Sequence, residues 1–599
     1  MKKAQQRTTL LFLALIGSLL AVWIGIHLAP YRSQGLKGIV FALTYASTNP
    51  FSFHFVPETF STVCIAVLAY VLVAGVWYTS SQGFRRGEEY GSAKWGNASA
   101  IDHKYRDRKH PFNNQILTRC VAMGNSEKDL YRHQRNSNVL VIGGSGAGKT
   151  RGYVMPNLLQ SEISYVILDP SGEILRATGN FLKQRGYRIR VLNLVNPEAS
   201  SRYNPFVYLQ KDDDVDQMVE NFWKATTQEG AQKGEQIWDD TAKELLSALA
   251  YYLYYFAPPS EQNFPMIQYL VRNMAIEGEE KTKSPVDRLF DELEEKNPDH
   301  IALKHYRSYH SGAAKTLQSI QITLLSRLGK FNLDSIERLS TTIQDELGLF
   351  TAAETKTVIF AVTPVADTSL NFFVSLLYGQ LFELLYAYGN AHGKLKVPLH
   401  FLMDEFANIT LPRDFDKRLA TFRKYLISSS IILQDQSQLK ALYEKQWQSI
   451  VNNCDSLLYL GGNESGTHEY LSKLLGKETI RTNTYGVSKG RGGSFSKNEQ
   501  QLGRELMTPD EIRQMDNRYC LLLIRGEPPV MDLKYDLKMH PNFQFTAYGK
   551  GQPYRHDDLD HAASLAEAIF GLSEEEIRKL PTPSPVPFVW VERGDGEPN

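Results

Sequence analysis

The stretch Val139–Thr150, VLVIGGSGAGKT, runs from four apolar residues directly into a glycine-rich turn that ends in lysine and threonine. It matches the pattern G-x-x-x-x-G-K-[ST] in full, and the apolar residues before it predict a buried parallel strand that is followed by a helix. In such a loop, backbone N–H groups surround phosphates and the helix N-terminus adds a positive dipole. The stretch therefore predicts a P-loop within an α/β domain, binding a nucleoside triphosphate.

The residues at the end of this loop have distinct expected roles. Lys149 would reach the outer phosphates, and the Thr150 hydroxyl would coordinate Mg²⁺. Pro156, one to two turns later, should kink or end the first helix. We therefore expect ATP and Mg²⁺ as cofactors. The residues expected to bind the nucleotide are Gly143, Gly144, Ser145, Gly146, Ala147, Gly148, Lys149 and Thr150.

A P-loop needs a carboxylate at the end of a neighbouring strand to orient Mg²⁺, and two apolar runs end in aspartate. YVILD ends at Asp169, and PLHFLMDE contains Asp404 and Glu405. The second is the better candidate, because Glu405 also supplies a base that can polarise the attacking water. We assign Asp404 to the metal and Glu405 to catalysis, and we interpret Asp169 as a strand-end residue near the site.

A third apolar run, SSSIILQ, ends at Gln434. An amide at a strand tip beside the γ-phosphate could sense whether that phosphate is present. A plain strand-end glutamine without such a role is the alternative interpretation.

The composition limits the classes of protein that fit. A chain of 599 residues suggests about three to five domains. Lys+Arg and Asp+Glu both number 66, so the chain is not a polycation and any nucleic-acid surface must be local. Cys64, Cys120, Cys454 and Cys520 lie far apart, which excludes a zinc motif or a disulfide framework and fits a reducing cytosol.

Two segments near the N-terminus, Leu10–Ala29 and Phe60–Thr79, each have twenty residues without an ionised side chain. About 20 apolar residues span a bilayer core as a helix. The first is long for a signal peptide, lacks a clear cleavage site and is followed by the second, so we expect two spans; a buried hairpin in a soluble protein is the alternative.

Basic residues flank this pair of segments on the outer sides. The positive-inside rule then places both termini and the bulk of the chain in the cytoplasm and residues 30–59 outside, as a short hairpin. We expect an inner (plasma) membrane location. The flanking basic residues are Lys2, Lys3 and Arg7 before the first segment, and Arg85, Arg86 and Lys94 after the second.

About 230 residues separate Asp169 from Asp404, and they show helical spacing of apolar positions. This is too much for one crossover, so we expect a mostly helical insertion in an α/β domain with a parallel sheet. The proline-rich C-terminal tail could be a docking segment or inert. The expected parts are a stem (1–90), a first nucleotide-domain part (91–206), the insertion (207–350), a second part (351–545) and the tail (546–599).

The ordered blocks along the chain resemble the type IV coupling proteins, the TraG/TraD-like DNA pumps of conjugation and type IV secretion. The resemblance covers most of the chain, and the ordered set is more specific than the P-loop alone. After the two apolar segments and GGSGAGKT come ILDPSGE, RYNPF at Arg202–Phe206, WDDTAKELL at Trp238–Leu246, LMDEFANI at Leu402–Ile409, ILQDQSQLKALY at Ile432–Tyr443 and LMTPDEI at Leu506–Ile512.

The resemblance implies a ring hexamer with a RecA-like motor domain, an all-helical domain and a two-helix transmembrane stem. It implies ATP hydrolysis and the passage of single-stranded DNA, with its bound relaxase, to a type IV secretion channel. Lys149 and Thr150 match the family's Walker A pair and Asp404 and Glu405 its Walker B pair. Gln434 matches its sensor glutamine.

Arg423, eleven residues before Gln434, resembles the family's arginine finger, which reaches a neighbouring subunit's ATP site. From spacing alone it would be a solvated arginine. Ser488–Gln500, with Lys489, Arg491 and Lys497, could contact DNA phosphates, although a solvated hairpin loop is the simpler interpretation.

Rival functions share part of this pattern. The closest rival is an assembly ATPase that energises a protein-secretion channel without touching DNA. A chromosome-segregation pump usually carries more spans and a winged-helix end, and an ABC-type transporter needs a signature helix that LGGNESG at Leu460–Gly466 does not supply. A kinase would not need Glu405 or the sensor strand.

Overall fold

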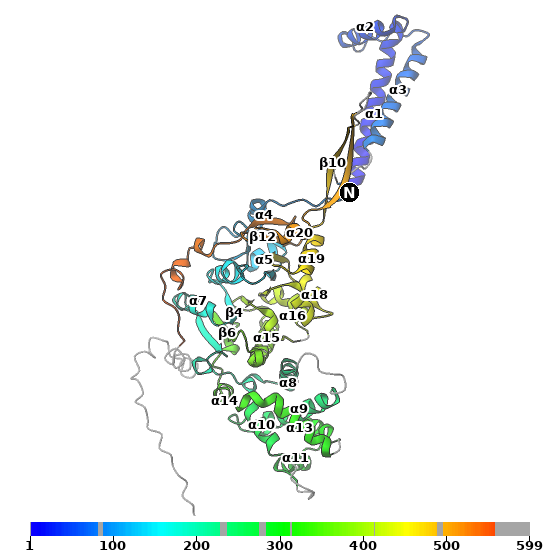
Figure 1. Cartoon of the computed structure of the whole chain (residues 1–599). Helices are drawn as coiled ribbons and strands as arrows, with labels where there is room; N and C mark the ends of the chain where they lie inside the picture. Colours follow the sequence, from blue (N-terminus) through cyan, green and yellow to red (C-terminus); the bar gives the residue numbers. More distant parts are fainter. Residues whose placement is uncertain are drawn as a thin grey trace, which may run out of the picture. The chain divides into compact units, whose positions relative to one another are not determined.

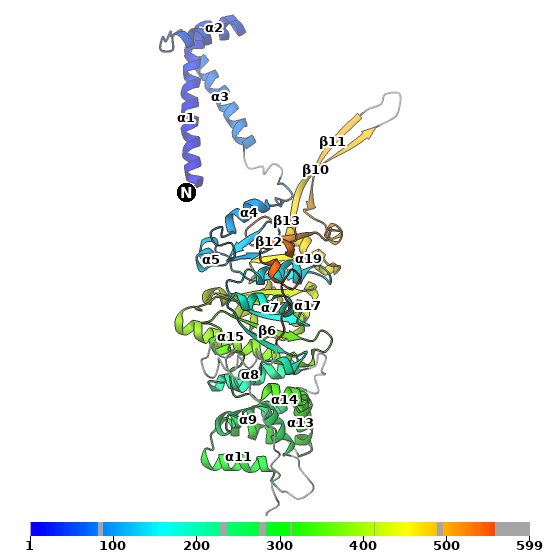
Figure 2. The same ribbon diagram turned by 90° about the vertical axis from the view of Figure 1, so that its left-hand side faces the viewer.

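The computed structural model describes residues 2–81, 88–227, 236–274, 283–311, 314–412, 414–487 and 495–556. The chain forms two compact units (Figures 1 and 2). One comprises Met1–Ser92 and Lys477–Arg504, and the other Ala93–Gly476 and Glu505–Asn599. Arg85, Arg86, the glycine-rich segment with Lys489 and Arg491, and the proline-rich tail lie outside the described residues.

A nine-stranded sheet forms the centre of the larger unit, in the order β13-β12-β9-β3-β8-β7-β4-β6-β5. From β9 to β5 every neighbouring pair is parallel. A separate antiparallel pair, β1 and β2, lies in the same unit. The strands are β1 (Asn114–Ile116), β2 (Ala122–Gly124), β3 (Val139–Ile142), β4 (Ser164–Pro170), β5 (Arg188–Asn193), β6 (Thr357–Thr363), β7 (Leu399–Met403), β8 (Ile427–Leu433), β9 (Ser456–Tyr459), β12 (Tyr519–Ile524) and β13 (Val530–Leu533).

The sheet departs from the expected parallel arrangement at one edge. There β12 runs antiparallel to β9, and β13 runs antiparallel to β12. Only Arg525–Pro529 connects the last two strands. A parallel pair needs a crossover of a dozen or more residues, so a connection this short allows only a hairpin.

Both faces of the central sheet are covered, which explains why its strands read as continuous apolar runs. Leu140 and Ile142 of β3 belong to one buried cluster, whereas Val139 and Val141 belong to the other. This alternation follows the period of two along a strand. The site at the strand ends is therefore built on a rigid base.

Between β5 and β6, the described residues from Asp212 to Ser340 form helices and no strand, as the apolar spacing led us to expect. Their core is continuous with one face of the sheet. Phe222, Phe264 and Phe331 stack at its centre, with ring centroids 4.8 and 5.2 Å apart. The helices are α8 (Asp212–Thr226), α9 (Gln236–Phe256), α10 (Phe264–Arg272), α11 (Pro285–Lys296), α12 (Ile301–His310), α13 (Ala314–Arg327) and α14 (Asp334–Ser340).

The remaining helices of the larger unit connect or cover the strands. They are α4 (Ala98–Tyr105), α5 (Glu127–His133), α6 (Met155–Leu158), α7 (Glu173–Gln184), α15 (Phe372–His392), α16 (Phe415–Thr421), α17 (Gln436–Leu442), α18 (Trp447–Asn452), α19 (Ser465–Leu475) and α20 (Pro509–Arg513).

The smaller unit holds the N-terminal apolar segments and a two-stranded ribbon of β10 (Lys477–Val487) and β11 (Phe495–Glu505). Its helices are α1 (Lys2–Leu28), α2 (Gly35–Thr48) and α3 (Thr59–Ser81), and α1 packs against α3. The segment expected to be a simple hairpin between the two apolar helices thus contains a helix of its own, α2.

Among the described residues, three helical segments are long and apolar enough to cross a membrane. Two of them, Ala14–Gln34 and Thr59–Val76, are mostly exposed and overlap the apolar segments Leu10–Ala29 and Phe60–Thr79. The third, Thr368–His392, is 72% buried because α15 packs inside the core of the larger unit. Its apolar character therefore has a structural cause within the protein.

Candidate nucleotide-binding site

The glycine-rich loop begins where β3 ends and leads into a π-helical turn, Thr150–Val154. Gly146 has φ 73° and Gly148 has φ 86°, the left-handed region that only glycine enters at little cost. The helical segment ends at Leu158, two residues after Pro156. The loop thus has the backbone conformation that its sequence requires, and the first helix is short, as the proline predicts.

Lys149 lies over this loop. Its Nζ donates hydrogen bonds to the carbonyl oxygens of Gly143 at 2.7 Å and Gly144 at 3.2 Å. Burial lowers the pKa of Lys149, and the nearby carboxylates of Asp404 and Glu405 oppose that effect. A half-buried cation held by carbonyl oxygens at a glycine-rich loop fits a phosphate chain.

The structure brings Thr150 and Asp404 into contact across 254 residues of sequence. Thr150 Oγ1 donates a hydrogen bond to Asp404 Oδ2 at 2.7 Å. Asp404 is buried, and burial raises the pKa of its carboxyl, while the Thr150 bond and the Lys149 charge act in the opposite direction. A hydroxyl and a carboxylate paired beside a P-loop are the donor set that Mg²⁺ needs.

The strand that carries Asp404 is not the immediate neighbour of the P-loop strand, contrary to our expectation. In the sheet order β3-β8-β7, β8 lies between the two strands. The strand next to the P-loop is therefore the one that ends before Gln434. The hydrogen bond between Thr150 and Asp404 therefore passes across the end of β8.

Glu405 adopts φ 54°, a left-handed conformation that is uncommon for a residue with a side chain. Its carboxylate Oε2 accepts a hydrogen bond from Asn408 Nδ2 at 3.0 Å. Backbone strain of this kind costs about 1–3 kcal/mol and collects at functional sites. The turn therefore fixes Glu405 in a defined position directly after Asp404.

Gln434 follows the last residue of β8 and is exposed. Its backbone N–H donates to Gln438 Oε1 at 2.9 Å. It lines the same pocket as Lys149, Asp404 and Glu405, so the structure places it with them.

The pocket has a volume of about 450 Å³; we refer to it as the nucleotide pocket. Its wall includes residues to which we assigned no role from the sequence, among them Arg151. The Arg151 guanidinium lies 3.7 Å from the Glu173 carboxylate and 4.6 Å from the ring centre of Tyr548. The position of Arg151 directly after Thr150 was the one signal that could have identified it. The lining residues are Gly144, Ser145, Gly146, Gly148, Lys149, Thr150, Arg151, Asp169, Pro170, Ser171, Glu173, Ile174, Val365, Asp404, Glu405 and Gln434.

Asp169 also borders the pocket, but its carboxylate is engaged elsewhere. It accepts hydrogen bonds from the backbone N–H groups of Ile174 at 3.1 Å and Leu175 at 2.7 Å, in the first turn of α7. Complete burial raises the pKa of Asp169 to about 7. These contacts are those of a group that fixes the N-terminus of a helix.

Arg423 is not brought to the pocket of its own chain. It lies in the turn Phe422–Tyr425, which precedes β8, whereas Gln434 follows the other end of that strand. Its Nη2 donates to the carbonyl oxygen of Leu130 at 2.9 Å, and the side chain is half-buried. Arg423 thus lies at the other end of β8 from Gln434, and its half-buried side chain is hydrogen-bonded within the chain rather than fully solvated.

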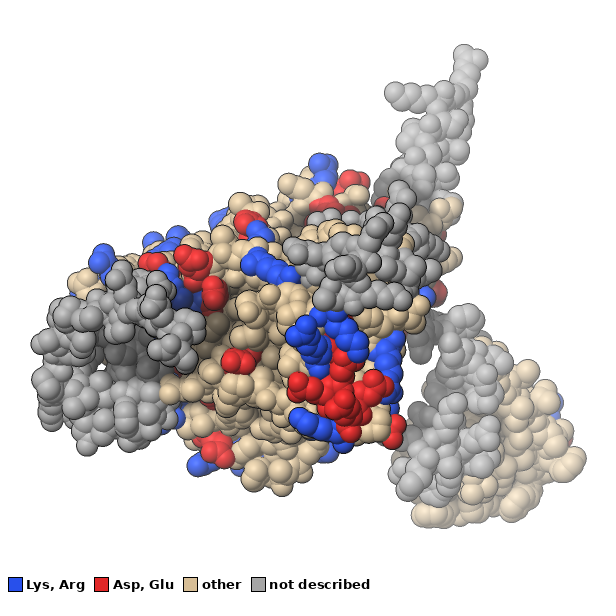
Figure 3. All heavy atoms as spheres, turned by 90° about the horizontal axis from the view of Figure 1, so that it is seen from below, with Lys and Arg blue, Asp and Glu red and all other residues tan. Residues whose placement is uncertain are grey.

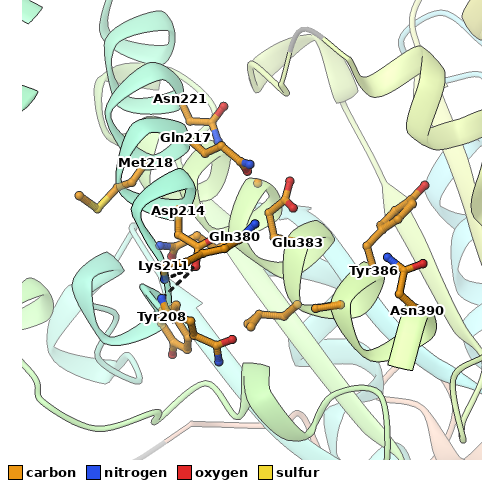
Figure 4. Close-up of a pocket in the computed structure, with 14 residues that line it drawn as sticks. Tyr208, Lys211, Asp214, Gln217, Met218, Asn221, Gln380, Glu383, Tyr386 and Asn390 are labelled. Carbon is orange, nitrogen blue, oxygen red and sulfur yellow. Dashed lines mark hydrogen bonds between the residues drawn. The ribbon is translucent and has the colours of Figure 1, made fainter. Parts of the chain in front are cut away.

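A different pocket, of about 270 Å³, opens between α8 and α15 (Figure 4). Its two carboxylates already have partners within the chain. Asp214 accepts from the backbone N–H groups of Gln210 at 2.9 Å and Lys211 at 3.2 Å, and Glu383 accepts from Arg418 Nη2 at 2.5 Å. The Asp214 contacts cap the start of α8 and the Glu383 contact joins α15 to α16, so neither carboxylate assigns a ligand to the pocket.

Comparison with known proteins agrees with this geometry. The family model "Type IV secretory system Conjugative DNA transfer" matches residues 94–536. Protein VirD4 of Rhizobium rhizogenes is 23% identical over 502 residues, covering 82% of this chain and 71% of its own length. Protein VirD4 of Rhizobium radiobacter is 25% identical over 484 residues, covering 78% and 67%.

Solved structures support the same fold. The unbound conjugative coupling protein TrwBdeltaN70 superposes with a TM-score of 0.54 at 17% identity, over 76% of this chain and 97% of that one. TrwB in complex with ADP and Mg²⁺ gives a TM-score of 0.54 at 17% identity, over 74% and 93%. The expected α/β motor fold with a helical insertion and N-terminal apolar helices is therefore confirmed.

Proposed function

Because this chain belongs to the family of type IV secretory system conjugative DNA transfer proteins, we propose that it is a membrane-anchored ATPase that moves DNA towards a type IV secretion channel. The observation that carries the proposal is the contact of Thr150 with Asp404 beside the strained turn of Glu405. That arrangement combines a metal site with a base, which a hydrolase needs and a simple nucleotide-binding protein does not.

In this proposal, ATP and Mg²⁺ occupy the nucleotide pocket. Lys149 exchanges its two carbonyl partners for the outer phosphates, and Thr150 and Asp404 hold Mg²⁺, which when bound neutralises charge on the phosphates. Glu405 accepts a proton from the attacking water. Gln434 contacts the γ-phosphate and reports its presence to β8.

The proposal includes a homo-hexamer in which Arg423 acts on a neighbouring subunit. Within one chain Arg423 lies at the end of β8 that is far from the nucleotide pocket. A catalytic role for Arg423 therefore requires a second copy of the chain. An arginine supplied in this way stabilises transition-state charge and is worth about 10³–10⁵ in rate.

Mixing two inactive variants tests this arrangement. Rings made only of Arg423→Ala subunits should bind ATP without hydrolysing it. Mixed with Lys149→Ala subunits, this variant should recover some activity, because some interfaces then combine an intact Lys149 with an intact Arg423. Normal hydrolysis by Arg423→Ala alone, or no recovery on mixing, would exclude a role across subunits.

We further propose that α1 and α3 span the inner membrane twice, with both termini and the larger unit in the cytoplasm. The support is the length and exposure of both apolar helices and the basic residues around them. A reporter that is active only outside the membrane should be active when fused at residue 45 and silent at residue 100. The reverse pattern would overturn this orientation.

The proposed substrate is single-stranded DNA with its bound relaxase, and the proposed partners are the channel proteins. On the face shown in Figure 3, Lys and Arg side chains lie beside Asp and Glu, so the described residues there form no continuous basic area.

The decisive experiment measures ATP hydrolysis by the full chain in lipid nanodiscs with and without single-stranded DNA. DNA should raise the rate, and Glu405→Gln should abolish both the basal and the stimulated rate. Hydrolysis that does not respond to DNA but responds to channel proteins would favour the assembly ATPase instead.

A further inference from the structure

The segment between the two apolar helices contains α2, which runs across the end of the α1–α3 pair rather than along it (Figures 1 and 2). It docks through small residues spaced one helical turn apart, Gly38, Ala42 and Ala46, all of which are buried. A Cβ at Gly38 would lie 2.1 Å from the carbonyl oxygen of Tyr31. Close packing therefore fixes α2 against α1 and the turn Ala29–Gln34 that follows it.

The rest of α2 and the chain after it expose large apolar side chains, which we call the outer apolar surface. Val40 is 66% and Phe41 62% exposed, and Phe51 and Phe55 in the following segment are 86% and 75% exposed. Ile39 and Leu43 are exposed as well. Contiguous apolar surface of this kind rarely faces water and marks contact with a membrane or another protein.

The distribution of these residues around α2 distinguishes contact with a membrane from contact with another protein. Successive residues of a helix are rotated by about 100°, so the exposed apolar side chains at 39, 40, 41 and 43 are spread widely around the helix, and the exposed polar Thr44 and Thr48 lie between Val40 and Phe41, with Ser47 beside Val40. A protein partner that docks on a helix typically covers one stripe. The boundary of a membrane can cover apolar side chains on several sides of a helix while its polar side chains face the headgroups and water.

Tryptophan and tyrosine side chains with polar groups lie around the C-terminal end of α2. Trp23 Nε1 donates to the carbonyl oxygen of Pro50 at 2.8 Å, and the Tyr45 hydroxyl lies 3.2 Å from Ser52 Oγ. The rings of Tyr31 and Tyr45 are 6.4 Å apart. Tryptophan and tyrosine gather at the headgroup level of membranes, so this end of the helix pair has the composition of a membrane–water boundary.

An apolar groove of about 670 Å³ lies among α1, α2 and α3 and points to the same surroundings. Its walls include Leu20, Ile24, Ile39 and Ile65, and Arg32 lies at its rim. Arg32 Nη1 donates to Ser61 Oγ at 2.6 Å. Acyl chains fill such a groove without cost, whereas water in it would lack hydrogen-bond partners.

From these observations we infer that α2 and the phenylalanines after it lie in the boundary between headgroups and acyl chains of the outer leaflet, with phospholipid as the partner. The inference rests on the proposed spanning by α1 and α3. It adds that the external segment is not a free hairpin but a flat anchor, which holds α1 and α3 at a fixed depth.

Nitroxide labels in the full chain, in nanodiscs of phosphatidylethanolamine and phosphatidylglycerol, test the inference. Single cysteines replace Phe41 and Phe51, with Ser47 as the polar control on α2 and Leu68 as the control within α3. The exposed native Cys64 and Cys120 are changed to serine. Access of each label to oxygen and to a water-soluble nickel chelate is then measured.

Labels at 41 and 51 should be more accessible to oxygen and less accessible to nickel than the label at 47. Their depth in the bilayer should be smaller than that of the label at 68. Nickel access at 41 and 51 equal to that at 47 would place α2 in water, and shielding from both reagents would mean that protein covers it; either result overturns the inference. Loss of the oxygen signal at 68 would instead contradict the proposed span.

Gly38→Leu provides a matched disruption, because the larger side chain cannot fit against the Tyr31 backbone. It should detach α2 and change the depth of the label at 41 while leaving the label at 68 unchanged. An unchanged depth at 41 would mean that docking on α1 does not set the position of α2, and the anchor would be excluded.

Discussion

The ends of β4 and β7, neighbouring strands of one sheet, look alike in sequence and differ in the structure. Each strand is a buried apolar run with an aspartate at its end, Asp169 within the last residues of β4 and Asp404 directly after β7, and both aspartates are buried. Asp404 accepts from the Thr150 hydroxyl and is followed by the strained Glu405. Asp169 accepts from two backbone N–H groups of α7.

The difference shows that hydrogen-bond partners, more than position, decide what a strand-end carboxylate can do. An aspartate whose partner is a P-loop hydroxyl can share a metal with it. An aspartate occupied by backbone N–H groups fixes a helix, and moving it would leave those groups without partners, at about 1–3 kcal/mol each. We therefore propose that β7 carries the chemistry and β4 the support.

The strongest test of this division is Glu405→Gln, which keeps the shape of the side chain and removes the base. ATP hydrolysis should fall about 10²–10⁴-fold, the usual contribution of a general base. Binding of a fluorescent ATP analogue should be unchanged. Turnover at the wild-type rate would place the base elsewhere, and Glu173, which lines the same pocket, would be the next candidate.

Asp404→Asn should weaken Mg²⁺ binding about 10–100-fold, as expected for a group that orients a metal and its ligand. A titration of Mg²⁺ against analogue binding measures the change. Asp169→Asn is the matched control, because it makes the same substitution one strand away. Equal loss of Mg²⁺ affinity in both variants would remove the distinction between the two strand ends.

Asn408→Ala asks whether Glu405 needs its support. Asn408 donates the hydrogen bond to Glu405 Oε2, and a bond to a charged group is worth about tenfold in rate or more. Hydrolysis should fall by about that factor with nucleotide binding unchanged. Recovery in Asn408→Gln or Asn408→His, which keep a donor, would separate positioning from damage to the fold.

Local patterns made part of this site predictable. The spacing of the P-loop glycines and the Asp404–Glu405 pair are local patterns, and the structure gives Gly146 and Gly148 the left-handed conformation that the loop requires and brings the loop and the pair into one pocket. The position of β8 between β3 and β7 depends on long-range pairing, which no local pattern encodes. The same holds for the antiparallel edge formed by β12 and β13.

Apolar stretches were the least certain part of the prediction. α15 is as apolar as a candidate span yet lies in the core of the larger unit, and α2 was hidden in a segment expected to be a loop. An apolar composition indicates that a segment avoids water, but it does not indicate whether protein or lipid covers the segment. Only the packing of α15 and the exposure of α2 distinguish a cover of protein from a cover of lipid.

The smallest effect should come from Asp169→Asn, and it should appear in stability rather than in turnover. Because burial raises the pKa of Asp169 to about 7 in the folded chain, the folded state binds a proton that the unfolded state has released between about pH 4 and pH 7. This contribution to stability is complete below about pH 4 and is lost as the pH rises through 7. The melting temperature of the wild type relative to Asp169→Asn should therefore be higher at pH 5.5 than at pH 7.5, measured by tryptophan fluorescence in the same nanodiscs.

The charge of Asp404 also raises the pKa of Asp169. In an Asp404→Asn background, the change in this melting-temperature difference between pH 5.5 and pH 7.5 should therefore be smaller. A difference in melting temperature that does not change with pH would mean that Asp169 stays ionised throughout, and that its two N–H partners, not burial, set its charge.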